Sequence, residues 1–287
     1  MVIHTRHLIW ACCFTFFISC KQNKTTETTK EVTEKVEEGV EKPFELQTEE
    51  VSYQADTLTM KGYLAYDKNS TAKKPGVIVV HEWWGHNDYV RQRADMLAEL
   101  GYVALAIDMY GDGKQAAHPQ DAGKFAMSVM GNIDSATARF EAALNLLKSK
   151  ETVDADKIAA MGYCFGGSVV LTMANKGLDL DAVAAFHSGV SLPVMPTSEI
   201  KAKVLVCNGA EDPFIPKESV EAYKKAMDSV KADYTYVAYE GATHSFTSKM
   251  ADSLGKKFDL PVAYQKEADE KSWLALQELL DDAFAKE

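Results

Sequence analysis

The chain has 287 residues, a formal net charge of −11 and five cysteines. An acidic chain whose lysines are scattered makes nucleic acid and anionic lipid headgroups poor partners. Three of the five cysteines lie within the first twenty residues, so the rest of the chain is not a disulfide-stabilised scaffold.

The first nineteen residues have the pattern of a bacterial secretory signal. Residues 1–7 include one arginine and two histidines, and residues 8–19 are almost wholly apolar. This apolar run is too short to span a bilayer, which needs roughly 20 apolar residues. The signal ends in Phe17-Ile18-Ser19-Cys20, which resembles a lipobox, where cleavage precedes a cysteine that is then acylated.

We therefore expect residues 1–19 to be a lipoprotein signal peptide, with Cys20 as the lipidation site. The alternative is a plain secretory signal cut nearby, with Cys20 incidental. Either predicts an exported protein, periplasmic or membrane-anchored, that meets a membrane only through this anchor. Residues 20–44 are rich in Thr, Glu and Lys, which predicts a disordered linker. Residues 45–287 remain for one domain of ordinary size.

The domain alternates predicted strands and helices. Two alternating stretches, 51–55 and 58–66, predict an opening β-hairpin. Apolar runs predict further strands, mostly parallel and buried, at 76–81, 102–107, 158–163, 182–186, 203–207 and 234–239. Helical spacing predicts helices over 88–100, 135–147, from 166 onward, 217–230 and 263–285, and a partly helical excursion over 110–130. This order predicts an α/β fold, a mostly parallel sheet with helices on both faces.

The sharpest chemical signal is the run Gly162-Tyr163-Cys164-Phe165-Gly166-Gly167, between a predicted strand and a predicted helix. A nucleophile on a sharp strand-to-helix turn needs neighbours without side chains two positions before and after it. The helix N-terminus that follows favours a thiolate at Cys164. The alternative is a buried structural cysteine in a tight turn.

A thiol nucleophile needs a base, and in this type of fold the acid and the histidine follow it in that order. Asp212 follows the strand at 203–207, and His244 follows the strand at 234–239. Alone, Asp212 could cap the next helix and His244 could be a surface loop residue. Because parallel strands end at one edge of the sheet, their combination predicts a Cys164–His244–Asp212 triad.

Four sequence blocks together resemble a known family. They are the Cys164 run, Gly-Ala-Glu-Asp-Pro-Phe-Ile-Pro at 209–216, Thr-His-Ser-Phe at 243–246, and His81-Glu82-Trp83-Trp84-Gly85. They look like the signature blocks of the dienelactone hydrolase (carboxymethylenebutenolidase) family of the α/β-hydrolase superfamily, and the resemblance runs from about Ser52 to the C-terminus.

The resemblance implies an ester or lactone hydrolase that uses the Cys164–His244–Asp212 triad without a metal or cofactor. It also implies that Glu82 partners the nucleophile and controls when the thiolate forms, although Glu82 could instead be an exposed acid or a helix cap. The family pattern would form the oxyanion hole from the backbone N–H groups of Trp83 and Phe165, a pairing that this fold generally uses.

The predicted pocket departs from the family at its charged positions. Known members hold the substrate carboxylate with arginines, one of them four residues past the histidine, where this chain has Ser248. The excursion at 110–130 offers only Lys114 and Lys124, and Lys249 could act as a point charge. We therefore expect a general ester or lactone hydrolase whose pocket includes Trp84, Tyr110 and Phe246, although such aromatics are often core residues.

A thiolate is itself a good leaving group, so esters and lactones are better substrates for it than peptides. The alternatives are an inactive hydrolase-fold lipoprotein that acts as a binding or scaffold domain, and a cysteine acyltransferase or peptidase with the same triad. We expect a small-molecule substrate and favour a monomer. No metal-ligand spacing pairs the remaining histidines.

Overall fold

The computed structural model describes residues 43–285. The predicted signal peptide, the lipidation site Cys20 and nearly all of the predicted linker lie outside the described residues, and they stay predictions. Among residues 43–285, no helix is both long enough and apolar enough to cross a membrane.

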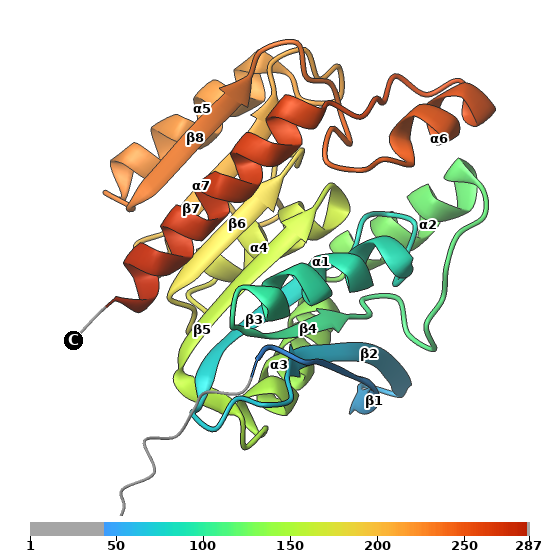
Figure 1. Ribbon diagram of the computed structural model, residues 1–287. Coiled ribbons are helices and arrows are strands. Elements are labelled where there is room, and N and C mark those ends of the chain that lie inside the picture. The colour runs from blue at the N-terminus through green and yellow to red at the C-terminus, as the bar shows by residue number, and fades with distance from the viewer. Residues whose placement is uncertain (1–42, 286–287) are drawn as a thin grey trace, which may run out of the picture. The chain divides into compact units, whose positions relative to one another are not determined.

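The described chain forms one eight-stranded sheet in the order β1-β2-β4-β3-β5-β6-β7-β8 (Figure 1). The strands are β1 Leu46–Ala55, β2 Leu58–Asp67, β3 Lys74–Val80, β4 Val103–Ile107, β5 Val153–Tyr163, β6 Ala182–Phe186, β7 Lys203–Gly209 and β8 Tyr234–Tyr239. β1 and β2 are antiparallel, β2 is antiparallel to β4, and all neighbours from β4 to β8 are parallel. The predicted hairpin therefore extends the main sheet at one edge.

Helices cover both faces of the sheet, as predicted. They are α1 Asp88–Glu99, α2 Pro119–Met130, α3 Ile133–Lys148, α4 Phe165–Asn175, α5 Lys217–Ser229, α6 Ala251–Phe258 and α7 Lys266–Phe284. Buried side chains of α1 and α7 pack with one face of the sheet, and those of α2, α3, α4 and α5 pack with the other (Figure 1).

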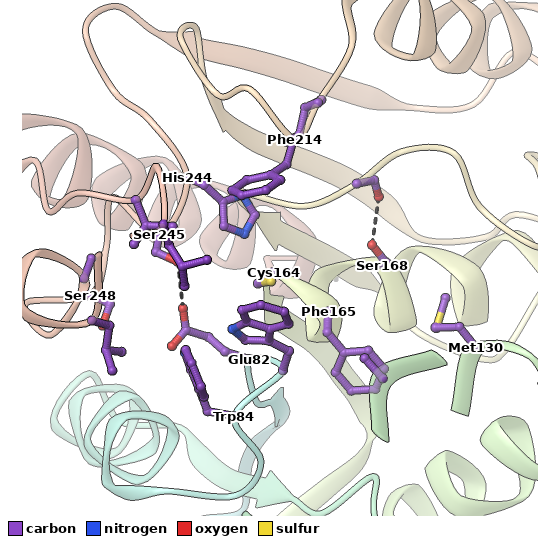
Figure 2. Close-up of a pocket in the computed structure, with 18 of the residues that line it drawn as sticks. Glu82, Trp84, Met130, Cys164, Phe165, Ser168, Phe214, His244, Ser245 and Ser248 are labelled. Atoms are coloured by element: carbon purple, nitrogen blue, oxygen red, sulfur yellow. Dashed lines mark hydrogen bonds between the residues drawn. The ribbon is translucent and has the colours of Figure 1, made fainter. Parts of the chain in front are cut away.

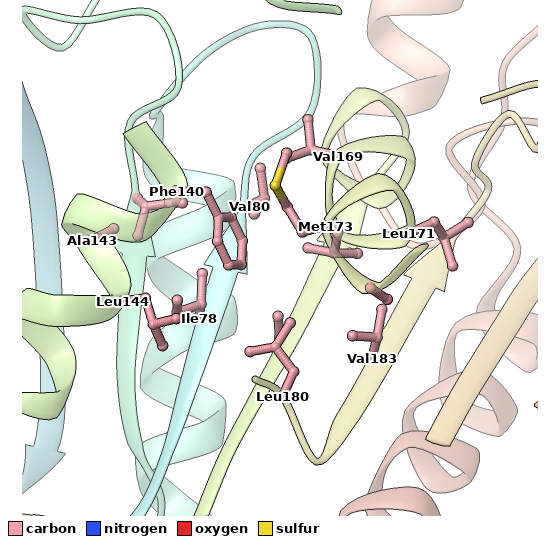
Figure 3. Close-up of a cluster of buried hydrophobic side chains, with 14 of the residues drawn as sticks. Ile78, Val80, Phe140, Ala143, Leu144, Val169, Leu171, Met173, Leu180 and Val183 are labelled. Atoms are coloured by element: carbon pink, nitrogen blue, oxygen red, sulfur yellow. The ribbon is translucent and has the colours of Figure 1, made fainter. Parts of the chain in front are cut away.

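The central strands are buried on both faces of the sheet, which explains why their sequences are almost continuously apolar. In β3, Ile78 and Val80 point into one core, while Val77 and Val79 point into the other. Figure 3 shows Ile78 and Val80 beside Phe140 of α3, with Val169 of α4 in the same cluster. A strand buried on both faces has no solvent side and hence no polar alternation.

Four elements differ clearly from the sequence predictions. β5 begins at Val153, earlier than expected, and its pairing with β3 shifts register between Pro75 and Gly76. The 110–130 excursion contains a full helix, α2, which Pro119 begins after His118 as the N-cap. The short helix α6 was not predicted, and the helix expected over 263–285 begins at Lys266.

Candidate active site

Three parallel strands end at one edge of the sheet and bring three predicted residues together. Cys164 follows β5 directly, Asp212 follows β7 and His244 follows β8. His244 Nδ1 lies 2.7 Å from Asp212 Oδ2, and the Asp212 side chain is fully buried. Cys164 and His244 both line the same cavity, and the charge of Cys164 raises the pKa of His244. Figure 2 shows the His244 ring over Cys164.

The His244 ring is held on both sides. It packs edge-on against His187, with ring centroids 5.2 Å apart, and edge-on against Phe214, at 5.1 Å. His187 is fully buried, and its Nε2 lies 2.8 Å from Thr247 Oγ1. Together with the Asp212 bond, these contacts fix the direction of the imidazole.

The turn at Cys164 requires its glycine neighbours. Cys164 has φ of 52° and ψ of −115°, a left-handed conformation that costs a non-glycine residue energy. A Cβ on Gly162 would lie 2.2 Å from Gly166 O, and a Cβ on Gly166 would lie 2.4 Å from Val80 O. The backbone N–H of Cys164 donates to Phe186 O at 2.9 Å, which fastens the turn to β6.

The surroundings of His244 favour its protonated form. Burial lowers the pKa of His244, but the negative charge of Cys164, the hydrogen bond that His244 donates to Asp212 and the charge of Asp212 outweigh this and raise it to about 10. Cys207 is different: burial raises the pKa of its thiol to about 12, although a contact with Tyr239 Oη lowers it slightly. Of the two cysteines that the structure describes, Cys164 is therefore the one beside a group that favours a positive charge.

Glu82 is a buried carboxyl group of the same site. Its Oε1 accepts a hydrogen bond from Ser245 Oγ at 3.2 Å (Figure 2), and the residue is 4% exposed. Burial raises the pKa of Glu82, while the charge of His244, the Ser245 bond and the charge of Arg93 oppose the rise. Neither alternative for Glu82 holds, because it is not exposed and Asn87 caps α1.

The two predicted oxyanion donors lie on the cavity wall. Phe165 is the first residue of α4, where backbone N–H groups have no intrahelical acceptor. Trp83 lies in a turn closed by a hydrogen bond of 3.2 Å from Gly85 N to Glu82 O. Gly85 has φ of 95°, and a Cβ there would lie 2.3 Å from Lys114 O. The turn therefore needs glycine at this position.

The cavity has a volume of about 420 Å³ and is mostly apolar. Trp84 lines it, as predicted, and so does Ser248. Among the described residues, no lysine or arginine lines this cavity. Lys114 and Lys124 are solvent-exposed beside Asp112 and Asp121, and Lys249 lines a neighbouring cavity.

Two predicted pocket residues lie elsewhere. Phe246 is fully buried in the core against Tyr239, because Ser245 has φ of 58° and turns the chain away from the cavity. Tyr110 is also buried; its ring packs against Phe165, and its hydroxyl donates to Trp83 O at 2.9 Å. Tyr110 therefore does not line the cavity but packs behind two residues that do, Trp83 and Phe165.

Other residues form the wall instead. Phe214 follows Asp212 by two positions, inside a sequence block that already pointed to the site. Met127 and Met130 of α2, and Leu254 of α6, also line the cavity. Little in the sequence indicated that these three residues line the cavity, because the sequence showed neither that α6 exists nor which face of α2 turns inward.

Most of the chain is similar to known proteins. The model of the dienelactone hydrolase family matches residues 60–284. Protein usf of Aquifex pyrophilus is 29% identical over 228 residues, which cover 76% of this chain and 97% of that protein.

Two solved structures are similar over 83% of this chain. One, titled m3DLH, is 36% identical with a TM-score of 0.79 and is covered over 99% of its length. The other, a dienelactone hydrolase-like promiscuous phosphotriesterase, P91, from metagenomic libraries, is 32% identical with a TM-score of 0.77 and is covered over 98%. The chain belongs to the dienelactone hydrolase family and is an ester or lactone hydrolase with the α/β-hydrolase fold.

Proposed function

We propose that the protein hydrolyses carboxylic esters and lactones through Cys164, His244 and Asp212, by way of a thioester acyl-enzyme. The observation that carries the proposal is the pairing at His244. Asp212 holds one ring nitrogen at 2.7 Å, and the charges of Cys164 and Asp212 raise the pKa of His244 to about 10, which favours the imidazolium. An imidazolium beside a thiol is the arrangement that makes a cysteine nucleophilic near neutral pH.

In the first half of the reaction, the Cys164 thiolate attacks the carbonyl carbon and forms a C–S bond. The carbonyl oxygen takes the negative charge and accepts hydrogen bonds from the N–H groups of Trp83 and Phe165. When the C–O bond breaks, the leaving oxygen takes the proton from His244 Nε2. In a lactone this leaving group stays attached to the acyl chain.

In the second half, His244 Nε2 removes a proton from a water molecule that attacks the thioester. The C–S bond of the second tetrahedral species breaks, and Cys164 leaves as a thiolate beside the imidazolium. The sum is ester plus water giving acid plus alcohol. Asp212 keeps Nδ1 protonated throughout, so that Nε2 is the nitrogen that exchanges the proton.

Glu82 tunes the charge balance of this pair. As a carboxylate it attracts the His244 imidazolium and so competes with the Cys164 thiolate. As a neutral acid it leaves the imidazolium to the thiolate. Burial favours the neutral form of Glu82, which supports a role for this residue in controlling when the thiolate forms.

A p-nitrophenyl acetate assay with Cys164→Ala tests the proposal. The variant is expected to lose the rate above background, and mass spectrometry of rapidly quenched wild type is expected to show an acyl group on Cys164. Cys207→Ser is the matched control and is expected to remain active. A full rate in Cys164→Ala, or an acyl group on another residue, would contradict the mechanism.

The same experiment separates the alternatives. An inactive scaffold would hydrolyse no ester, and its Cys164 would react with iodoacetamide no faster than Cys207. An acyltransferase would pass the acyl group to an added alcohol or amine in preference to water. A peptidase would cleave peptides as fast as esters of the same acyl group.

Hydrolysis of uncharged phosphotriesters is a second candidate function. The solved structure of 32% identity is titled a promiscuous phosphotriesterase. In this chain, no described lysine or arginine lines the cavity, which suits an uncharged phosphoryl group better than an anionic one. Release of p-nitrophenol from diethyl p-nitrophenyl phosphate, with Cys164→Ala as control, tests this candidate; an equal rate in the variant would refute it.

A further inference from the structure

We propose that the cavity selects esters whose acyl and alcohol portions are both uncharged and apolar. This inference rests on the proposed function, because it needs Cys164 as the point of attack. It follows from the shape of the cavity on either side of Cys164 and from the charges that face it.

Two helices supply apolar residues to the cavity wall. We call the part lined by Ala126, Met127 and Met130 of α2 the α2 arm, and the part lined by Ala251 and Leu254 of α6, with Val262 just after it, the α6 arm. In Figure 2, Met130 and Ser248 lie on opposite sides of the Cys164 sulfur. A carbonyl carbon bound at the sulfur therefore has an apolar surface available for each of its two substituents.

Each ionisable residue that lines the cavity already has a role in the proposed reaction. The ionisable lining residues are Glu82, Cys164 and His244. His244 Nδ1 is held by Asp212 at 2.7 Å, and the charges of Asp212 and Cys164 both favour the imidazolium, so His244 already has two partners for a positive charge. A substrate carboxylate would lose its water, face the Glu82 carboxyl group and find no cation.

The nearest buried cation is not available either. Arg93 is 6% exposed, and its guanidinium is held at 2.7 Å by Asp269 and at 2.7 Å by Thr247 O. It lines the neighbouring cavity and not the one at Cys164. If Arg93 moved toward the substrate, the part-buried Asp269 carboxylate would lose its ion-pair partner, which is unfavourable.

The mouth of the cavity is apolar as well. Met127 is 68% exposed and Phe214 is 52% exposed, and both line the cavity. An apolar substituent that reaches the mouth would cover these two side chains and gain from their burial. A charged substituent would gain nothing from them.

Two matched substrate pairs test the inference, one for each side of the ester. The acyl pair is the p-nitrophenyl monoester of adipate and its methyl ester; the alcohol pair is 4-acetoxybenzoate and its methyl ester. We expect kcat/KM to be about 100-fold higher for the neutral member of each pair. Equal rates, or faster hydrolysis of an anionic member, would overturn the inference while leaving the Cys164 mechanism intact.

Lysine variants locate the arm that holds each substituent. Met130→Lys and Leu254→Lys each place a cation in one arm, where a partly exposed lysine can reach water. One of them is expected to raise kcat/KM at least about 10-fold for the anionic acyl ester, relative to its neutral partner. Leu274→Lys adds the same charge at an exposed site on α7 and is expected to leave this ratio unchanged.

The possible outcomes separate the two claims. If no ester is turned over, or if Cys164→Ala is as active as wild type, the proposed function fails and the inference fails with it. If turnover depends on Cys164 but neither arm variant changes the ratio, only the two-armed cavity is refuted.

A second, independent observation concerns His81, at the end of β3. We infer that His81 is a positioning residue for the backbone N–H of Trp83. His81 is fully buried, and its Nε2 accepts a hydrogen bond from Met109 N at 3.1 Å. A backbone N–H can only donate, so Nε2 carries no proton and Nδ1 carries it. His81 Nδ1 therefore donates to Glu82 O, which is 2.5 Å away.

The acceptor of this bond is part of the peptide group that contains Trp83 N–H. Because a peptide is planar, a bond that fixes the Glu82 carbonyl also sets the direction of Trp83 N–H on its other side. The imidazole is itself fixed between Tyr110, at 4.7 Å between ring centroids, and Phe165, at 5.6 Å. Burial lowers the pKa of His81 to about 4, although the hydrogen bond to the Glu82 backbone opposes this shift. The low pKa keeps the ring neutral.

Two substitutions distinguish this role from a general contribution to packing. His81→Asn can keep an N–H close to Glu82 O, whereas His81→Gln places its amide near Met109 N and loses the donor to Glu82. We expect His81→Gln to lower kcat about 10- to 100-fold with KM within about twofold, since one oxyanion donor is worth on the order of 100-fold or more. His81→Asn is expected to recover most of this loss.

Alkylation of Cys164 by iodoacetamide supplies the decisive control, because that displacement develops no oxyanion. The alkylation rate is expected to be the same in wild type and both variants. Parallel losses of alkylation and hydrolysis, or equal losses of kcat in the Gln and Asn variants, would overturn the role of His81.

Discussion

Replacing Glu82 by glutamine removes the charge of this buried group and keeps its shape. The glutamine Oε1 can still accept the hydrogen bond from Ser245 Oγ that the carboxylate accepts at 3.2 Å. The change therefore isolates one quantity, the free energy of ionising a carboxyl group at this position.

The sign of the effect follows from the raised pKa of Glu82. A carboxyl group whose pKa is higher in the folded protein holds its proton more tightly there than in the unfolded chain. Wild type therefore loses stability as the pH rises from the unfolded value near 4.5 to the folded pKa. For one proton the slope is at most about 1.4 kcal/mol per pH unit. Glu82→Gln lacks this loss.

Urea unfolding of wild type and Glu82→Gln between pH 4 and pH 8 measures the difference. We expect the variant to gain stability relative to wild type as the pH rises above 4.5, and the gain to level off above the folded pKa. Glu221→Gln, at an exposed position of α5, is the control and is expected to show no such trend. A difference for Glu82→Gln that stays flat, or that shrinks with rising pH, would refute the reasoning.

Three further outcomes are expected. Gly162→Ala puts a Cβ 2.2 Å from Gly166 O, so urea unfolding should show a loss of about 1–3 kcal/mol, and esterase activity should largely disappear. Asp212→Asn releases His244 Nδ1 and should lower kcat roughly 1,000-fold or more in a steady-state ester assay, whereas the exposed Glu211→Gln should not. Cys20→Ala should move the protein from the membrane to the soluble fraction and abolish incorporation of labelled fatty acid.

Each of these outcomes can fail in a definite way. A fully active Gly162→Ala enzyme would mean that the turn tolerates a side chain. If Asp212→Asn and Glu211→Gln behaved alike, the buried aspartate would have no role in the reaction. Equal membrane association of Cys20→Ala and wild type would favour the plain secretory signal.

The sequence predicted the sheet and the location of the site because both depend on local rules. A strand buried on both faces must be continuously apolar, as in β3, β4 and β6. Parallel strands place the residues that follow them at one edge, so the positions of Cys164, Asp212 and His244 could be predicted from strand order. The glycines around Cys164 were readable because the backbone contacts leave no room for a Cβ.

The walls of the cavity could not be predicted in the same way. Phe246 follows His244 by only two positions, yet the left-handed conformation of Ser245 directs it into the core. Tyr110 reaches Trp83 across two loops, a contact that no sequence period encodes. The helix α6 has only eight residues and includes Gly255 and two lysines, so its helical pattern was too short to recognise.

The short helix α6 has a consequence for how this enzyme can change. It contributes Ala251 and Leu254 to the cavity; Ala251 is buried, whereas Leu254 is half-buried and belongs to neither of the two hydrophobic core clusters. Substitutions of Leu254 can alter which molecules enter without weakening the sheet that carries the thiol and the imidazole. New substrate preferences can therefore evolve through α6 at little cost to folding.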